Sequence, residues 1–314
     1  MYPLPAISRD IAQHILRRLP AHPVCRFAPS PTGYLHLGHL AHLLFVWGIT
    51  KSLQGRVILR MEDHDRTRCT PAYERAILED LEWLGFVPDA GHPEDFRAGA
   101  SAYRQSDCAT RYTRMLARLA GDGHVYGCAC SRNGIKARTG QTDGEIRYDG
   151  HCRDLGLRMD AGTGIRFRIP GELVGFEDAW LGAIAQAPAK QCGDMLLKDR
   201  HGHWTYHFAV VCDDLEQGVN LVIRGQDLLD STGRQILLGQ ALGRGTRPFY
   251  LHHPLIGDEA GQKLSKRDFG ESLRDLRQAG KDPRELLGEA AWRVGMLDAP
   301  RALGPDALPT LFLP

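Results

Sequence analysis

The order of elements predicted for residues 24–62 places the strongest constraint on the fold. The segment HPVCRFA has the composition of a short buried strand that stops at Pro29. A loop with two prolines and two glycines follows, and LAHLLFVWGITKSL then has apolar residues at helical spacing. The segment RVILRME predicts a second strand. Strand, loop, helix and strand in this order form a βαβ unit, which requires parallel strands joined by a right-handed crossover.

Composition is compatible with an α/β protein that binds no membrane. The chain has 314 residues, of which 43% are hydrophobic and 25% are charged, as is ordinary for globular proteins. No stretch approaches the roughly 18 apolar residues that span a bilayer. The N-terminus lacks the apolar segment of a secretory signal, so we expect a cytoplasmic location in which the eight cysteines stay reduced. The net charge of +1 gives no global basic field that would indicate nucleic acid.

Capping residues mark the ends of several predicted helices. Gly55 is a plausible C-cap for the helix of the βαβ unit. Thr70 is a candidate N-cap for TPAYERAILEDLEWLGF, and Pro71 then occupies the first helical position. The segment SDCATRYTRMLARLAGDG predicts another helix, with Gly121 and Gly123 past its end.

The pattern changes between Tyr126 and Pro188, where glycines, cysteines and short strand-like segments replace the long helices. We interpret this region as an inserted, mostly β module. Helical and strand patterns then return, and the tail is helical from about residue 283 to residue 295. The predicted divisions are an N-terminal extension (1–23), the first half of a Rossmann-type domain (24–125), the inserted module (126–190), the second half (191–245) and a loop with a helical tail (246–314).

The loop after the first strand has the residues of a phosphate-binding site. In parallel sheets, ligands bind at the carboxyl ends of the strands, where RFAPSPTGYLHLGH lies. His36 and His39 share one face at a helix N-terminus, which attracts anions, and imidazoles can donate to charge developing at phosphorus. The alternative is a loop with two surface histidines. Stiff prolines and permissive glycines shape this loop: Pro29, Pro31, Gly33 and Gly38.

A second basic element, KLSKR, follows the glycine-bearing segment LIGDEAGQ. Its lysines, Lys263 and Lys266, could close over a triphosphate and neutralise it near the transition state. The alternative is a solvated basic loop.

An acidic pair, Asp213 and Asp214, follows the apolar run HFAVV, which we interpret as a strand. At the end of such a strand, the pair could face ATP or RNA. A pair of charges at the start of a helix is the alternative.

Together, HLGH and KLSKR resemble the HIGH and KMSKS signatures of class I aminoacyl-tRNA synthetases. The segments around them, GRVILRMEDHDRTR and YHFAVVCDDLEQGVNLVIRGQDLLDSTGRQ, are similar to the glutamyl-tRNA synthetase catalytic domain, and the resemblance extends from about Val24 to Asp268. Leu37 and Leu264 stand where Ile and Met are commonest, and Arg267 replaces the final Ser. The resemblance implies a Rossmann-type parallel sheet, an inserted zinc-bearing module and a short helical C-terminal region.

The resemblance also implies the residues of the site. Those that would bind glutamate are Arg26, Ser30, Glu62, Tyr206 and Arg224. Those that would bind ATP are Gly33, His36, Gly38, His39 and Lys266, and the catalytic set would be His36, His39, Lys263 and Lys266. Arginine forks suit a dicarboxylic substrate. As alternatives, the arginines could be ordinary ion-paired residues, and Glu62 could be a partner of Arg60 or Arg66.

The implied reaction is adenylation. A glutamate carboxylate attacks the α-phosphate of ATP, which enters with Mg²⁺, and the acyl group then passes to an RNA. The residues after Arg267 are too few for the large helical anticodon-binding region of full glutamyl-tRNA synthetases, so we expect no such domain. The chain therefore resembles the stand-alone paralogue that attaches glutamate to queuosine in the anticodon of tRNA(Asp). We expect it to act as a monomer.

The cysteines suggest a metal site in the inserted module. Cys128 and Cys130 form a C-x-C pair, and Cys152 follows. Tetrahedral zinc needs a fourth ligand, for which Tyr148, His151 and His124 are the candidates. The resemblance implies a C-x-C…Y-x₃-C zinc set and therefore favours Tyr148. Zinc would stabilise an insert that has little core of its own.

Three other functions compete with this interpretation. A truncated enzyme that charges tRNA(Glu) would have the same residues around ATP and glutamate. A small-molecule nucleotidyltransferase would share the H-x-G-H loop, but KLSKR and VIRGQDLL argue against it. A non-catalytic glutamate-binding module would have no need for the signature histidines and lysines.

Overall fold

The predicted βαβ unit forms the centre of the protein. The computed structural model describes residues 9–142, 144–255 and 271–312. Strands β1 (Val24–Phe27) and β2 (Arg56–Leu59) pair in parallel, and α2 (Leu37–Ser52) connects them. The parallel pairing confirms the crossover expected from the sequence.

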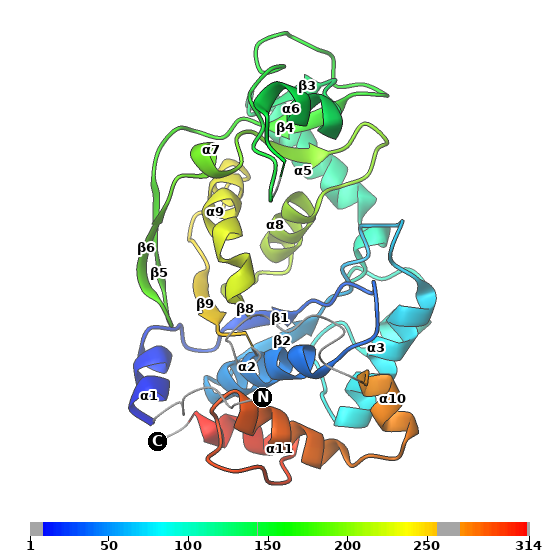
Figure 1. Ribbon diagram of the computed structural model, residues 1–314, viewed down its shortest axis with the longest axis vertical. Coiled ribbons are helices and arrows are strands. Elements are labelled where there is room, and N and C mark those ends of the chain that lie inside the picture. The colour runs from blue at the N-terminus through cyan, green and yellow to red at the C-terminus, as the bar shows by residue number, and fades with distance from the viewer. Residues whose placement is uncertain (1–8, 143, 256–270, 313–314) are drawn as a thin grey trace.

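A second parallel pair, β8 and β9, continues the sheet beside β1. The backbone N–H of Val24 donates to the side-chain oxygen of Asn220 (2.8 Å), and the Asn220 N–H donates to the Val24 carbonyl (3.0 Å). The strands therefore follow the order β2, β1, β8, β9 (Figure 1). The chain runs outward from β1 to β2 on one side and from β8 to β9 on the other, so the strand order reverses between β1 and β8. A point at which the strand order reverses is called a switch point, and α/β sheets bind ligands there. The elements of this half are β8 (Leu221–Gly225), η2 (Gln226–Ser231), α9 (Thr232–Ala241) and β9 (Phe249–His253).

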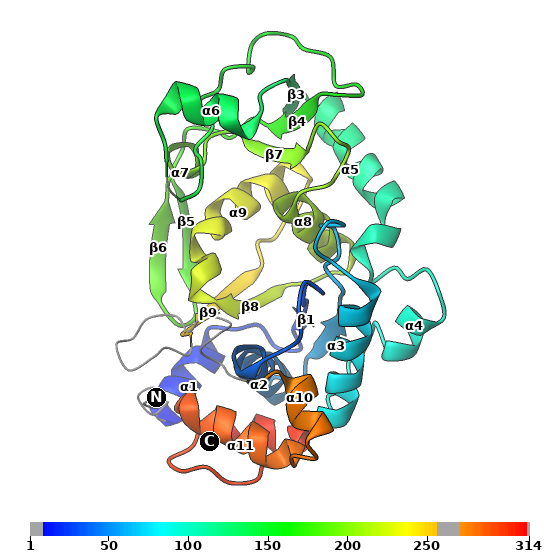
Figure 2. The same cartoon turned by 45° about the vertical axis from the view of Figure 1, so that its right-hand side comes forward.

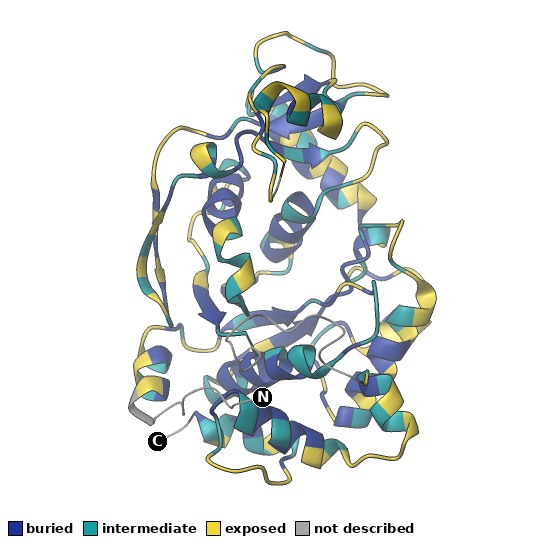
Figure 3. Cartoon of the chain, in the orientation of Figure 1, coloured by how far each residue is buried: buried dark blue, intermediate teal, exposed yellow. Residues whose placement is uncertain are grey.

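Helices cover both faces of these strands. Helices α8 (Tyr206–Glu216) and α9 lie on one side, and α2 lies on the other with α11 (Pro283–Arg293) and η3 (Pro305–Leu311) beneath it (Figure 1). Helix α2 is buried around most of its circumference, because strands and helices enclose it (Figure 3). Helix α10 (Leu273–Gln278) packs against α3 (Pro71–Leu84) at the side of the molecule (Figure 2).

The end of the molecule farthest from α11 carries a small antiparallel sheet (Figure 1). It consists of β3 (Val125–Cys128), β4 (Gly164–Phe167) and β7 (Met195–Lys198), with α6 (Arg132–Thr139) beside it. Strands β5 (Val174–Asp178) and β6 (Gly182–Gln186) do not join it. They pair with each other, and β5 meets β9 where Asp178 is paired with Tyr250. Strands on either side of the predicted boundary at residue 190 therefore pair with each other: β4 with β7, and β5 with β9. The composition of a strand indicates that it is buried, but it does not indicate which strand lies beside it.

The remaining elements connect these layers. They are α1 (Arg9–Arg17), α4 (Pro93–Arg97), η1 (Gln105–Asp107), α5 (Ala109–Gly121), β5 (Val174–Asp178), β6 (Gly182–Gln186) and α7 (Pro188–Gln191). None of the helices described is both long and apolar enough to cross a membrane.

One predicted helix end is confirmed and another is wrong. The Thr70 side chain accepts from the Tyr73 N–H and caps α3 as expected. Gly55, in contrast, does not cap α2. Leu53 is the C-cap, and Gln54 adopts the positive φ of 54°. A Cβ on Gly55 would lie 2.4 Å from the Pro23 carbonyl oxygen, so glycine is needed here for the close approach of two chain segments.

Gly55→Ala should therefore lower the free energy of unfolding by about 1–3 kcal/mol, because the backbone must shift to admit the methyl group. Gln54→Gly is the matched control, and it should change stability by less than about 1 kcal/mol, since glycine accepts a positive φ. Urea unfolding of both variants measures the difference. Equal stability of Gly55→Ala and the parent would contradict the close approach.

Candidate active site

The five residues predicted to bind glutamate line one cavity of about 330 Å³ at the switch point. Arg26 comes from β1 and Arg224 from β8. Tyr206 is the first residue of α8, Glu62 follows β2, and the exposed Ser30 lies on the loop after β1. The structure thus brings together residues that are far apart in the sequence.

The buried carboxylate of Asp214 holds Arg26 in place. Arg26 Nε donates to Asp214 Oδ1 (3.1 Å), and Arg26 Nη1 donates to the Ile223 carbonyl (3.3 Å). Asp214 Oδ1 also accepts from Arg60 Nη1 (2.8 Å). Burial alone would raise the pKa of the Asp214 carboxyl, but Arg26 and Arg60 outweigh it and lower the pKa below its usual value. The ionised carboxylate therefore ties together β1, α8 and the residue after β2.

Glu62 is a partner of Arg60, as one alternative from the sequence proposed, and it also lines the cavity. Arg60 Nη2 donates to Glu62 Oε1 (3.1 Å), and Glu62 lines the cavity. Burial raises the pKa of the Glu62 carboxyl, and Arg60 opposes this shift. A cationic group bound in the cavity would favour the ionised form.

The predicted position of the acidic pair is wrong. Asp213 and Asp214 lie inside helix α8, not at the end of a strand, and both are buried. Asp213 is fully buried. It accepts hydrogen bonds from Arg111 (2.5 Å), Tyr112 (2.9 Å) and Gln105 (2.9 Å), and so joins α8 to α5 and η1.

Arg224 is a buried cation bonded to neutral groups alone within the described residues. Its guanidinium donates to His252 Nε2 (3.0 Å), Gln235 Oε1 (2.7 Å) and Thr232 Oγ1 (3.0 Å). His252 can accept at Nε2 because its Nδ1 donates to Asp178 (2.7 Å). Three of the five guanidinium N–H groups are used in this way, and two remain for a ligand. A buried, unneutralised cation at a cavity favours an anionic ligand.

The histidines of HLGH cap helix α2. His36 Nδ1 accepts from the Gly38 N–H (3.1 Å), and His39 Nδ1 accepts from the His36 N–H (3.2 Å). In the neutral imidazoles, each proton therefore lies on Nε2, which can donate. The Gly38 N–H is already used in this cap, and Gly33 is not among the glycines with positive φ. Lys263 and Lys266, on the KLSKR segment, lie outside the described residues.

Three thiols meet in the insert as the sequence predicts. The sulfur atoms of Cys128, Cys130 and Cys152 lie within 4.8 Å of one another. The Tyr148 hydroxyl lies 3.4 Å from Cys128 Sγ and 3.9 Å from Cys130 Sγ. Neither His124 nor His151, the other candidates, belongs to this group within the described residues.

A cation lies beside the thiols. Arg166 Nε donates to Cys128 Sγ (3.2 Å), and its guanidinium stacks 3.7 Å over the Tyr148 ring. Burial opposes ionisation of Cys128, but its hydrogen bonds with Tyr148 and Arg166 lower the pKa of its thiol. The donor set suits a soft divalent metal such as zinc.

Comparison with known proteins places this site in a family. The sequence model of the catalytic domain of class I tRNA synthetases (E and Q) matches residues 24–302. The chain belongs to this family. It is 38% identical over 302 residues to a glutamyl-Q tRNA(Asp) synthetase of Symbiobacterium thermophilum, with 91% of each chain covered. It is 42% identical over 296 residues to a glutamate–tRNA ligase of Acidithiobacillus ferrooxidans, covering 88% of this chain and 60% of that one.

Solved structures support the same fold. The crystal structure of a glutamate tRNA ligase from Elizabethkingia meningosepticum, in complex with its amino acid, matches with a TM-score of 0.75 and 28% identity. The match covers 93% of this chain and 65% of that one. The α/β catalytic fold of class I synthetases, with its parallel sheet, is therefore that of this chain.

The sequence named Arg60 and Asp214 but not their contact with each other, which supports Arg26 and Glu62. It did not identify Asp178 and His252, which hold Arg224. The one available signal was the alternation of Arg60 and Glu62 after an apolar strand, which puts both side chains on one face. The other partners are too distant in sequence to be paired by pattern.

Asp214→Asn should cost about 3–5 kcal/mol of unfolding free energy at pH 7, because it leaves Arg26 and Arg60 buried without their shared charge. Asp160→Asn is the control. It removes an exposed ion pair with Arg158 and should cost less than about 1 kcal/mol. Urea unfolding measures both.

The cost of Asp214→Asn should also depend on pH. The folded-state pKa of Asp214 is lowered, so its contribution is complete above the unfolded pKa of about 3.9 and is lost as pH falls through the folded value. The stability gap between the parent and the variant should therefore narrow between pH 5 and pH 2. A gap that stays constant across this range would contradict an ionised Asp214.

Proposed function

We propose that this chain activates L-glutamate with ATP and transfers the glutamyl group to queuosine in the anticodon of tRNA(Asp). The observation that carries the proposal is the buried Arg224, whose described partners are neutral and which lines the same cavity as Arg26 and Glu62. The cations Arg26 and Arg224 complement the two carboxylates of glutamate, and the carboxylate of Glu62 complements its ammonium group.

The bound glutamate would use the outward-facing atoms of these residues. Arg26 and Arg224 donate to its carboxylates, and Glu62 accepts from its ammonium group. Each hydrogen bond to a charged group contributes about 1.5–3 kcal/mol. Burial, with Glu62 adding to it, raises the pKa of the Tyr206 hydroxyl, so this group keeps its proton and remains a donor. Ser30 adds a hydroxyl at the open edge of the cavity.

Adenylation needs positioning and charge stabilisation without a covalent enzyme intermediate. An oxygen of the glutamate α-carboxylate attacks the α-phosphorus, the bond to the bridging oxygen breaks, and pyrophosphate leaves. His36 and His39, whose Nδ1 atoms hold the cap of α2, would donate from Nε2 to the phosphates. Gly33 and Gly38 would let the nucleotide approach this loop, and Lys263 and Lys266 would neutralise the developing charge.

The choice of tRNA(Asp) rests on the relatives named glutamyl-Q tRNA(Asp) synthetase. Another such relative, from Geobacter sulfurreducens, is 39% identical and is matched over 94% of its length. The glutamate–tRNA ligase of Acidithiobacillus ferrooxidans is matched over 60% of its length. Charging of tRNA(Glu) is the second candidate, because the residues around glutamate would serve it equally.

Radiolabelled glutamate distinguishes the two acceptors. The protein should label tRNA(Asp) that contains queuosine and leave queuosine-free tRNA(Asp) and tRNA(Glu) unlabelled, because the acceptor is a hydroxyl of the queuosine ring. Labelling of tRNA(Glu) alone would replace the proposed function with the second candidate. Glutamate-independent exchange of pyrophosphate into ATP would reject both.

We further propose that Cys128, Cys130, Tyr148 and Cys152 hold a structural zinc ion. The three thiols and the Tyr148 hydroxyl lie close enough to face one ion, and their chemistry fits it. Zinc would join the C-x-C turn to the loop carrying Tyr148 and Cys152. Only a small core supports this region, which consists of Tyr126, Cys128, Ile135, Tyr148 and Cys152.

Cys152→Ser should release zinc and lower the melting temperature of the purified protein, because a hydroxyl is a poor zinc ligand. Elemental analysis and thermal unfolding provide the measurements. Cys69→Ser, at a half-buried thiol outside the cluster, is the control and should keep its metal. An unchanged zinc content in Cys152→Ser would remove Cys152 from the ligand set.

The other expected partners follow from the reaction. Mg²⁺ would enter on the phosphates of ATP as part of the substrate. A tRNA acceptor places the reaction in the cytoplasm, and we propose that the chain acts there as a monomer.

A further inference from the structure

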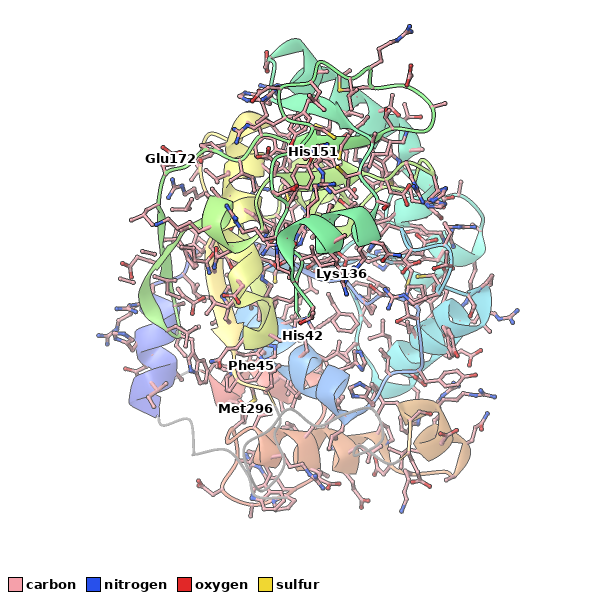
Figure 4. All side chains as sticks on the ribbon, turned by 45° about the horizontal axis from the view of Figure 1, so that its top comes forward. His42, Phe45, Lys136, His151, Glu172 and Met296 are labelled. Atoms are coloured by element: carbon pink, nitrogen blue, oxygen red, sulfur yellow. The ribbon has the colours of Figure 1, made fainter. Side chains whose placement is uncertain are left out.

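A pair of hydrogen-bonded histidines lies beside the cavity, and neither has a part in the function proposed above. His42 projects from α2, one turn beyond His39, and lines the cavity. Its Nδ1 lies 3.0 Å from Nε2 of His253, the last residue of β9. His253 stacks on Phe45, with ring centroids 4.6 Å apart and planes at 6°. Figure 4 labels His42 and Phe45, which both belong to α2.

The hydrogen bonds determine which nitrogen of each ring carries the proton. His253 Nδ1 lies 2.9 Å from the Pro254 carbonyl oxygen, which can only accept, so this nitrogen bears the hydrogen. In the neutral ring, His253 Nε2 is therefore an acceptor, and His42 Nδ1 donates to it. The remaining nitrogen of a neutral His42, Nε2, then has a free lone pair.

Both rings stay neutral at ordinary pH. Burial lowers the pKa of His42 well below its usual range, and His253, Arg26 and His39 add to the shift. Burial also lowers the pKa of His253 to about 4. Protonation of His253 would place its Nε2–H against the Nδ1–H of His42. The hydrogen bond from His42 to His253 would then be lost.

We propose that His42 Nε2 accepts a hydrogen bond from the ammonium group of the bound amino acid. Among the described residues, His42 has no hydrogen bond other than that to His253. His42 lines the cavity, and because its Nδ1 is bonded to His253, Nε2 is the nitrogen left to bond a ligand. His42 is thus a further substrate-binding residue, and His253 is the positioning residue that fixes its tautomer.

The composition of the cavity selects the ammonium group as the donor. Its other polar side chains include the cations Arg26 and Arg224, the carboxylate of Glu62 and the hydroxyls of Ser30 and Tyr206. A desolvated ammonium group has three N–H donors, and one carboxylate cannot satisfy them all. The ammonium group carries the only strong donors of glutamate when its carboxylates are ionised. The inference rests on the proposed function, since it assumes an amino acid in this cavity.

Steady-state kinetics of His42→Phe tests the contact. Phenylalanine keeps the ring that packs near Phe27 but has no acceptor. We expect KM for glutamate in pyrophosphate exchange to rise about tenfold or more, and KM for ATP to stay within about twofold. His42→Gln, whose amide oxygen can accept, should recover part of the loss. His14→Phe, at an exposed position of α1, is the control and should match the parent.

Two outcomes would overturn the proposal. A rise in KM for ATP with unchanged KM for glutamate would assign His42 to a nucleotide hydroxyl, and unchanged KM values for both substrates would exclude any contact. His253→Phe should keep the stacking on Phe45 and raise KM for glutamate by a smaller factor than His42→Phe, because His42 is then free to change its tautomer. An unchanged KM in His253→Phe would exclude its positioning role.

Nitrogen-15 NMR of the histidine-labelled parent protein provides a test that needs no variant. His42 should show a proton on Nδ1 and a bare Nε2 whose resonance shifts when glutamate binds. A proton on Nε2, or a resonance unmoved at saturating glutamate, would overturn the inference. If glutamate does not bind at all, the proposed function fails as well, whereas binding without a shift at Nε2 rejects His42 alone.

Discussion

The site depends on a single buried carboxylate. Asp214, on α8, accepts from Arg26 of β1 and from Arg60, which follows β2. Removing three charged groups from water is costly, and the cost is offset only because each is bonded to an opposite charge. The shared contact fixes the distance between α8 and the sheet. Arg60 also holds Glu62. The positions of one cation of the cavity, Arg26, and of its carboxylate, Glu62, therefore both depend on Asp214.

The residues around the cavity share one arrangement, in which each uses part of its hydrogen-bonding capacity on the protein and leaves the rest for a ligand. Arg26 uses Nε and Nη1, and Arg224 uses three of its N–H groups. Such anchoring fixes the orientation before the substrate arrives, so binding does not have to order these side chains.

Local patterns predicted the βαβ unit and the cap of α3, the family resemblance indicated the residues of the site, and the failed predictions have physical causes. Thr70 was identifiable as a cap because its hydrogen bond spans only three residues. The run HFAVV was interpreted as a strand because short apolar runs buried on all sides lack a distinct periodicity. That error placed Asp214 at a strand end, when it lies inside a helix. Gly55 was expected to cap a helix, and the Pro23 carbonyl that explains it belongs to another segment.

The sequence by itself determined the βαβ unit, the family signatures and the cysteines of the insert, and its resemblance to the family indicated five residues that line one cavity. Only the tertiary structure decided that β5 joins β9, that Arg60 and Arg26 share Asp214, and that His42 meets His253 from 211 positions away. Helical and strand periodicity record which face of an element is buried. They do not record which element covers that face, because many partners can bury the same surface and only the packed chain selects among them.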